Sequence, residues 1–197
     1  LDHGVSAIGY ALVEHERPGR FDVAAADALG VPPGPERGML QAGEAVTLTD
    51  GRVITPDAVL GPARPGRKIV LACDTAPSPV VAQAAHKADV LVHEATFGAE
   101  EAERARETLH STAGEAAEVA KLAEVRLLAL THLSTRYFGS ELAEQARAVF
   151  AETVVPRDFD VIEVPFPERG APALVKAGAR PVSSVGDDAN GAGGSGG

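Results

Sequence analysis

The sequence predicts an α/β domain, because short apolar strands alternate with helix-start signals from Lys68 onward. Hydrophobic residues make up 45% of the chain and charged residues 23%, as in an ordinary globular protein. The predicted strands cover residues 69–72, 90–92, 127–130 and 161–164. We expect one folded unit over residues 1–170.

Three helix starts separate these strands. Ser78 followed by Pro79 is a cap residue with proline in the first turn. Thr112 with Glu115 forms the pattern of a capping box ahead of an alanine-rich run. Ser140 is predicted to cap a further helix that ends near Phe150.

The first third of the chain is less regular. Proline and glycine are frequent between residues 30 and 43, so a loop is predicted there. Asp50 and Gly51 form the turn signal of a hairpin. The remaining predicted elements are a strand at 5–14, a helix at 22–29 and hairpin strands at 45–49 and 52–55.

Composition narrows the functional classes. A formal net charge of −10 disfavours a broad nucleic-acid surface, so any RNA contact must be local, for example at Arg64, Arg67 and Lys68 or at Arg136. The single cysteine, Cys73, excludes an intrachain disulfide and indicates an intracellular protein. No apolar run approaches the roughly 18 residues of a membrane span. Residues 181–197 are rich in glycine, serine and aspartate and are predicted to be a disordered tail.

Metal-binding residue types follow the predicted strands. Asp74 comes directly after the strand at 69–72, and His132 after the strand at 127–130. His3, His93 and His110 also lie at ends of elements, and such a set of carboxylate and imidazole groups is typical of zinc sites. From spacing alone an alternative stays open, in which Asp74 caps a turn and His132 is a hydrogen-bonded boundary residue.

Four motifs in register resemble the second half of ribonuclease Z, a zinc-dependent endonuclease that trims the 3′ ends of tRNA precursors. The resemblance covers roughly residues 1–165 and implies a metallo-β-lactamase fold, an αββα sandwich, of which this chain supplies the C-terminal part. The motifs are Asp74-Thr75, His93-Glu94-Ala95-Thr96, His110-Ser111-Thr112 and Thr131-His132-Leu133-Ser134-Thr135-Arg136-Tyr137. The loop Pro32-Pro33-Gly34-Pro35 and the start Leu1-Asp2-His3-Gly4 also look like that family.

The resemblance assigns roles by position. His3, Asp74 and His132 match zinc ligands, and the intact family site holds two zinc ions. Glu94 and His110 match a catalytic pair implicated in giving a proton to the departing 3′ oxygen, which is chemically reasonable because a glutamate can orient a histidine. Ser134 and Arg136 fit a role in contacting the substrate phosphate, because hydroxyl and guanidinium groups both pair well with phosphate oxygens. His93 is more simply structural, and Cys73 and Gln41 replace the glycine and lysine common in the family.

Two family features are not found where the resemblance expects them. The motif HxHxDH, which carries most zinc ligands, does not occur in the sequence. The second feature is the flexible arm that grips the tRNA elbow in many family members, and the resemblance places it ahead of His3. We therefore expect a fragment that is inactive alone and whose intact form is a cytoplasmic homodimer acting on tRNA precursors. The alternatives are a related phosphodiesterase for small esters and a non-catalytic remnant.

Overall fold

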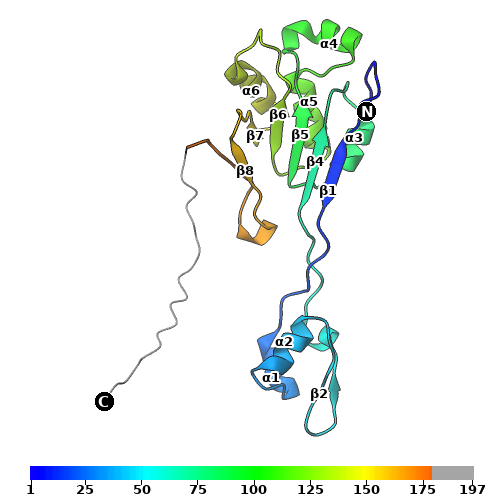
Figure 1. The fold of residues 1–197 in the computed structure, drawn as a ribbon, viewed down its shortest axis with the longest axis vertical. Helices are drawn as coiled ribbons and strands as arrows, with labels where there is room; N and C mark the ends of the chain where they lie inside the picture. The colour runs from blue at the N-terminus through cyan, green and yellow to red at the C-terminus, as the bar shows by residue number, and fades with distance from the viewer. Residues whose placement is uncertain (179–197) are drawn as a thin grey trace, which may run out of the picture.

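The structure, a computed structural model, describes residues 1–178 of the 197-residue chain. The predicted tail at 181–197 lies outside the described residues. A sheet with its helices forms one end of the molecule, and a small lobe lies at the other end of a narrow stalk (Figure 1). No helix in the described part is both long enough and apolar enough to cross a membrane.

A five-stranded mixed sheet forms the centre of the larger body. Its strands lie in the order β1-β4-β5-β6-β7, with β4 to β7 parallel and β1 antiparallel to β4. The bounds are β1 Tyr10–Val13, β4 Lys68–Ala72, β5 Val90–Glu94, β6 Leu128–Thr131 and β7 Thr153–Val154. The predicted α/β class is confirmed, and three of its four predicted strands are neighbours in this sheet.

Three helices cover one face of the sheet: α3 Pro79–Ala84, α5 Ala113–Leu122 and α6 Gly139–Arg147. Alanine is frequent where they meet the strands, and Ala116, Ala117 and Ala120 of α5 are fully buried. Small side chains allow close approach, so leucines from the sheet and from α6 fill the remaining space. The low aromatic content of the sequence therefore matches a core built from Ala, Val and Leu.

The other face of the sheet is only partly covered. Strand β8 Val161–Glu163 was expected among the α/β strands, but it pairs antiparallel with β9 Ala173–Val175 in a separate ribbon. Ile162 of this ribbon packs on an apolar cluster of the open face. Toward the β1 edge, Tyr10 and Leu12 remain 59% and 57% exposed. One sheet with helices on one face is half of the predicted αββα sandwich.

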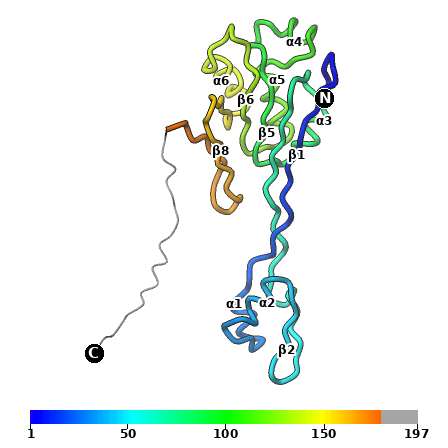
Figure 2. The backbone as a smooth tube through the Cα atoms, viewed as in Figure 1, coloured from blue at the N-terminus to red at the C-terminus, as the bar shows by residue number. Residues whose placement is uncertain are grey.

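A lobe protrudes between β1 and β4, on the C-terminal side of His3 (Figures 1 and 2). Its own small core contains Ala26, Val31, Leu40, Ile54 and Val59, all nearly or fully buried. Its elements are α1 Val23–Leu29, α2 Pro35–Gln41, β2 Val46–Thr47, β3 Val53–Ile54 and the 3₁₀ turn η1 Pro56–Ala58. The sequence pattern had predicted a loop where α2 forms.

The short helix α2 forms because its ends and one side chain are held locally. Pro35 occupies the first turn, where a missing N–H is harmless. Arg37 donates to the Val31 carbonyl of the preceding loop at 2.7 Å. It also pairs with the Asp27 carboxylate of α1. A propensity-based prediction misses such a helix, because its stability comes from these contacts.

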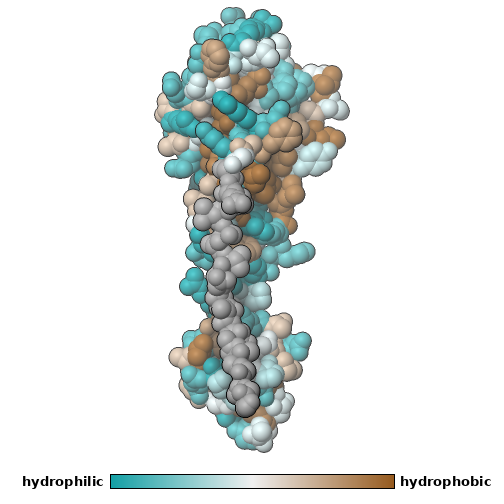
Figure 3. Space-filling view, turned by 60° about the vertical axis from the view of Figure 1, so that its left-hand side comes forward, coloured by the Kyte–Doolittle hydropathy of each residue, from teal (hydrophilic) through white to brown (hydrophobic). Residues whose placement is uncertain are grey.

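The stalk consists of two extended segments that run past each other. Arg17 and Arg64 form a β-bridge, and Gly19 is packed so closely on Gly61 that a Cβ on Gly19 would lie 1.9 Å from the Gly61 carbonyl oxygen. Glu168, in the 3₁₀ turn η3 Pro167–Arg169, pairs with both arginines, and these contacts lower the pKa of its carboxyl to about 2. In Figure 3 the narrow part of the molecule is mostly hydrophilic, whereas apolar residues gather on the sheet-containing part above it.

Three arginines of the stalk, Arg17, Arg64 and Arg67, are paired with glutamates. Arg64 contacts Glu168 at 2.9 Å, and Arg67 contacts both carboxylate oxygens of Glu14. The hydrogen bonds from Arg67 lower the pKa of Glu14 to about 2. In the phosphate-binding patch predicted at Arg64, Arg67 and Lys68, both arginines are thus paired with glutamates, whereas the Lys68 ammonium donates to the His86 carbonyl at 3.1 Å.

Two predicted helix starts are confirmed and one is wrong. The Ser78 side chain accepts from the Val80 backbone N–H, and Thr112 and Glu115 form both hydrogen bonds of the capping box. Helix α6 instead begins at Gly139 and ends at Arg147. Its first free N–H, on Phe138, is satisfied by the Glu141 side chain at 3.1 Å, so Ser140 is not the cap.

We predict that Thr112→Ala lowers the free energy of unfolding by about 1 kcal/mol, because it removes the hydroxyl that caps α5. Thr112→Ser retains the hydroxyl and should stay close to the parent chain. Urea unfolding followed by circular dichroism measures both variants. Equal stability of the alanine and serine variants would contradict a structural role for this cap.

Candidate metal and acid–base site

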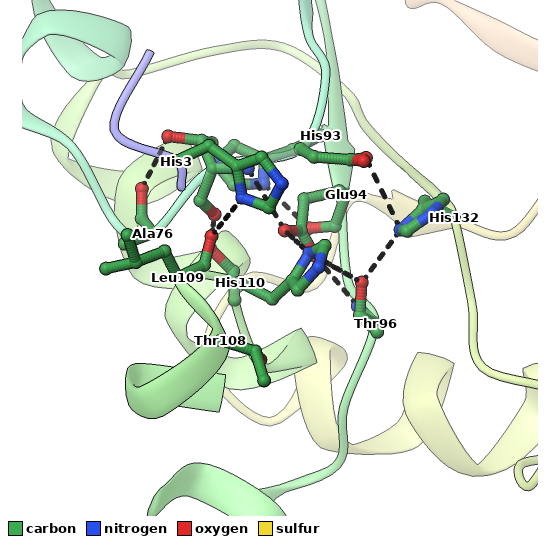
Figure 4. A network of polar contacts seen from close by, with 12 residues as sticks. His3, Ala76, His93, Glu94, Thr96, Thr108, Leu109, His110 and His132 are labelled. Atoms are coloured by element: carbon green, nitrogen blue, oxygen red, sulfur yellow. Dashed lines mark hydrogen bonds and ion pairs between the residues drawn. The ribbon is translucent and has the colours of Figure 1, made fainter. Parts of the chain in front are cut away.

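The candidate site lies where three neighbouring parallel strands end. Asp74 follows β4, Glu94 is the last residue of β5, and His132 follows β6. The carboxyl ends of parallel strands meet at one edge of the sheet, which brings these three side chains together. His110 enters from the connection between α4 Ala102–Thr108 and α5, and His3 from the N-terminal segment (Figure 4).

Three of these side chains form a group that can hold a metal ion. One ligand atom each from Asp74, His110 and His132 lies within 4.8 Å of the others. His3 adjoins the group through His110, with ring centroids 4.8 Å apart, and the rings of His110 and His132 are stacked at 5.4 Å. Three of the four histidines singled out from the sequence, and the aspartate, are thus brought to one place.

The Glu94 carboxylate is the buried anchor of the site, with no exposed side-chain area. Its Oε1 accepts from the Thr75 backbone N–H at 3.1 Å and from His110 Nδ1 at 2.7 Å. Its Oε2 accepts from the backbone N–H and the hydroxyl of Thr96, at 2.9 and 2.8 Å. Four donors around one carboxylate satisfy it fully and fix its orientation.

Each histidine of the site is held through its Nδ1 atom. His3 Nδ1 lies 2.9 Å from the carbonyl oxygen of Leu109, and His110 Nδ1 lies 2.7 Å from Glu94 Oε1. His132 Nδ1 lies 2.9 Å from the Thr96 hydroxyl. An Nδ1–H that donates to an oxygen leaves the lone pair on Nε2, which is the arrangement found in metal-ligating histidines. The donor set therefore fits a metal ion.

The backbone at His132 is adapted to this task. Its φ of +53° lies in the left-handed region, which costs a non-glycine residue on the order of 1 kcal/mol. Such a conformation ends β6 abruptly and turns the chain back at the sheet edge. The Asp74 carboxylate lies 3.4 Å from His132 Nδ1, and both side chains are partly exposed, at 39% and 50%.

The predicted phosphate-contacting residues lie on the loop after His132. The Ser134 backbone N–H donates to the Thr96 carbonyl, which joins this loop to the site. Arg136, however, pairs with Glu101 at 2.7 Å. The Tyr137 hydroxyl donates to the same carboxylate, and burial together with this hydrogen bond raises the pKa of Tyr137 to about 12. Glu101 belongs to the 3₁₀ turn η2 Ala99–Glu101.

His93 is separate from the cluster. It is fully buried, its Nδ1 lies 2.7 Å from the Glu94 carbonyl, and its Nε2 has no hydrogen-bond partner among residues 1–178. Burial lowers the pKa of His93 below its ordinary value of 6.5. Cys73, next to Asp74, is exposed. Gln41 ends α2 in the lobe, remote in sequence from the site.

Three hydroxyl-bearing residues of the site were not singled out from the sequence. Thr96 contacts Glu94 and His132, Thr75 donates its backbone N–H to Glu94, and the Ser111 hydroxyl donates to the Thr75 carbonyl at 2.7 Å. Their only signal was membership of the recognised motifs, in which each lies next to or near a residue with an assigned role. Threonine and serine are too common for adjacency alone to identify a role.

The comparisons with known proteins agree with the motifs. No protein-family model matches the chain. The chain is 53% identical over 168 residues to ribonuclease Z of Myxococcus xanthus, which covers 84% of this chain and 55% of the relative. It is 52% identical over 168 residues to ribonuclease Z of Haloferax volcanii, covering 84% and 53%. The chain thus spans about half the length of the curated relatives that it matches.

Similar solved structures match smaller parts. Human tRNase Z, short form, is 31% identical, with a TM-score of 0.42 over 57% of this chain and 37% of that one. The metallo-β-lactamase fold protein YhfI of Bacillus subtilis is 27% identical, with a TM-score of 0.43 over 45% and 36%. The identity to the curated relatives confirms the predicted resemblance to ribonuclease Z. This identity, together with the sheet and the helices that cover one of its faces, supports the predicted α/β fold class.

We predict that Glu94→Gln destabilises the chain by about 1–3 kcal/mol, because an amide NH₂ would face donors that now meet a carboxylate oxygen. Glu107→Gln, an exposed position on α4, is the matched control. Urea unfolding of both variants measures the difference. A loss no larger than that of the control would show that the four-donor arrangement does not stabilise the fold.

A second prediction concerns pH and His93. The unfolded chain takes up a proton near the ordinary histidine pKa of 6.5, whereas folded His93 stays neutral because burial lowers its pKa. The free energy of unfolding should therefore fall as pH decreases through about 6.5, with a contribution of up to about 1.4 kcal/mol per pH unit. Urea unfolding from about pH 7.5 to about pH 5.5 measures this slope.

The matched pair for that experiment is His93→Gln and His86→Gln. His86 is exposed, so its replacement should leave the slope unchanged. The His93 replacement should flatten it, although other groups still titrate in this range. If both variants keep the parent slope, His93 takes up a proton in the folded protein and the burial argument is wrong.

Proposed function

We propose that this ribonuclease Z homologue forms the carboxyl-terminal half of a zinc-dependent endoribonuclease that processes the 3′ end of tRNA precursors. One observation carries the proposal: His110, which is held by the buried Glu94 carboxylate, shares a possible metal-binding group with Asp74 and His132. A phosphodiesterase needs both functions next to each other. The curated relatives named ribonuclease Z support this reading.

The proposed zinc ligands on this chain are His3, Asp74 and His132, and the intact site is expected to hold two ions. Their fit rests on the donor types and on the Nδ1 hydrogen bonds of the two histidines. Zinc bound there supplies Lewis-acid stabilisation of charge on the phosphate oxygens. His110 also lies within the group of possible ligands, so its assignment to proton transfer depends on its bond to Glu94.

Proton transfer is assigned to His110. Glu94 receives the Nδ1–H of His110, which leaves Nε2 directed away from the buried carboxylate. In the proposed reaction the oxygen of water forms the new bond to phosphorus, and the bond between phosphorus and the 3′ oxygen of the tRNA breaks. His110, protonated, gives a proton to that 3′ oxygen, so the tRNA keeps a 3′ hydroxyl and the trailer carries the phosphate.

Substrate contacts are proposed at two places. Ser134 and Arg136 lie on the loop beside the site, where hydroxyl and guanidinium groups suit phosphate oxygens. Arg136 must then exchange its Glu101 partner for phosphate or contact both. The stalked lobe between β1 and β4 is proposed to be the tRNA-gripping arm, which the resemblance had placed ahead of His3.

Other parts of the proposal are what the resemblance to ribonuclease Z implies. We expect the intact enzyme to act in the cytoplasm and to form a homodimer. The described residues offer three of the proposed ligands, so this chain alone is expected not to cleave tRNA precursors. The competing candidates are a phosphodiesterase for small esters and a non-catalytic remnant without metal.

A chimera tests the proposal. The matching half of Myxococcus xanthus ribonuclease Z is replaced by the 168 aligned residues of this chain. We expect the chimera to cleave a tRNA precursor and to leave a 3′ hydroxyl. His110→Ala in the chimera should lower kcat by about 10²- to 10⁴-fold, because general acid catalysis is lost. His86→Ala is the control, because His86 is exposed and its backbone contacts Lys68 at the start of β4, the end of that strand opposite to the site.

The outcomes separate the candidates. Cleavage of bis(p-nitrophenyl) phosphate with no cleavage of the tRNA precursor would favour the small-ester enzyme. A chimera that folds but retains no zinc would favour the remnant. Full activity of the His110→Ala chimera would refute the assignment of proton transfer, whatever the substrate.

A further inference from the structure

The Thr96 hydroxyl contacts three side chains of the polar network in Figure 4. Its Oγ1 is 2.8 Å from Glu94 Oε2, 2.9 Å from His132 Nδ1 and 3.2 Å from His110 Nδ1. We propose that Thr96 is a positioning residue, which fixes the tautomer and orientation of His132 and ties this metal ligand to the carboxylate that holds His110.

Counting hydrogens gives the direction of each bond. A threonine hydroxyl has one hydrogen to donate and can accept further hydrogen bonds at its oxygen. Glu94, as a carboxylate, only accepts, so Thr96 donates to it. The same oxygen must then accept from His132. His132 therefore carries its proton on Nδ1 and presents the Nε2 lone pair outward.

The distances divide the two histidines between two acceptors. His110 Nδ1 is closer to Glu94 Oε1, at 2.7 Å, than to the Thr96 hydroxyl, at 3.2 Å. Glu94 therefore orients His110. His132 Nδ1 has Thr96 at 2.9 Å and Asp74 Oδ1 at 3.4 Å, so Thr96 is its main acceptor. Asp74 is itself a proposed ligand, whereas Thr96 has no other assigned role.

The local backbone holds the hydroxyl in place. The Thr96 N–H donates to Glu94 Oε2 at 2.9 Å, and the Thr96 carbonyl accepts from the Ser134 N–H at 3.2 Å. The residue is thus bonded on one side to the end of β5 and on the other to the loop after His132. Because the Thr96 backbone is held on both sides, its side chain loses little further conformational freedom when the hydroxyl accepts from an imidazole.

The structural part of this proposal does not depend on activity, but its relevance to zinc rests on the proposed function. The outer partner of a metal-ligating histidine commonly changes metal affinity by about 10- to 100-fold when it is removed. We therefore expect Thr96→Val, which keeps the shape but lacks the hydroxyl, to weaken zinc binding by that factor. Thr96→Ser keeps the hydroxyl and should bind zinc like the parent chain.

The test uses the ¹⁵N-labelled 197-residue chain with two readouts. Imidazole ¹⁵N–¹H correlation spectra of the metal-free chain report the tautomer of His132, recorded well above the ordinary histidine pKa of roughly 6.5. Calorimetric titration with zinc chloride reports affinity. The matched control is Thr108→Val, because the Thr108 hydroxyl is exposed and bonds only within α4, to the Arg104 carbonyl.

The expected result is an Nδ1–H tautomer of His132 in the parent, Thr96→Ser and Thr108→Val chains. Thr96→Val should show a mixed or Nε2–H tautomer and weaker zinc binding. Unchanged spectra and affinity in Thr96→Val would overturn the proposal. If that variant does not fold, the parent chain still decides, because an Nε2–H tautomer of its His132 also overturns it. If no chain binds zinc, the three ligands of this half do not suffice by themselves, and the tautomer readout alone then decides the role of Thr96.

Discussion

The buried carboxylate of Glu94 is the interaction on which the rest of the site depends. A carboxylate without exposed area must be fully hydrogen-bonded, and this one receives donors from three segments that are distant in sequence. It joins the turn after β4, the segment after β5 and the connection before α5. The carboxylate therefore positions His110 directly, and Asp74 through the neighbouring residue Thr75.

The sheet makes this convergence possible. Parallel pairing of β4, β5 and β6 places their carboxyl ends side by side, and the register sets Ala72 beside His93 and Glu94 beside Thr131. The helix-covered face anchors the strands through a core of alanine and larger aliphatic residues. The site thus stands on the largest buried cluster of the described residues, which favours a fixed geometry for acid–base and metal chemistry.

The negative charge of the chain and the proposed RNA substrate are reconciled by local pairing. Arg64, Arg67 and Arg136, three of the residues that the sequence suggested for phosphate contact, are each bonded to a glutamate, and Arg64 shares its glutamate with Arg17. Under the proposed function, positive charge at the site would come chiefly from a bound metal ion. The Glu101 carboxylate accepts from both Arg136 and Tyr137, two neighbouring residues of the loop after His132.

The sequence by itself determined the α/β class, the central strands β4, β5 and β6, the caps of α3 and α5 and the motifs shared with ribonuclease Z, because these follow from local patterns. Only the tertiary structure decided that α2 and the stalked lobe form, that β8 leaves the main sheet, and that Glu101 neutralises Arg136. It also revealed Thr96 between Glu94 and His132. The physical reason is the same in each case: these features depend on contacts between segments far apart in the chain, which no local pattern of residues encodes.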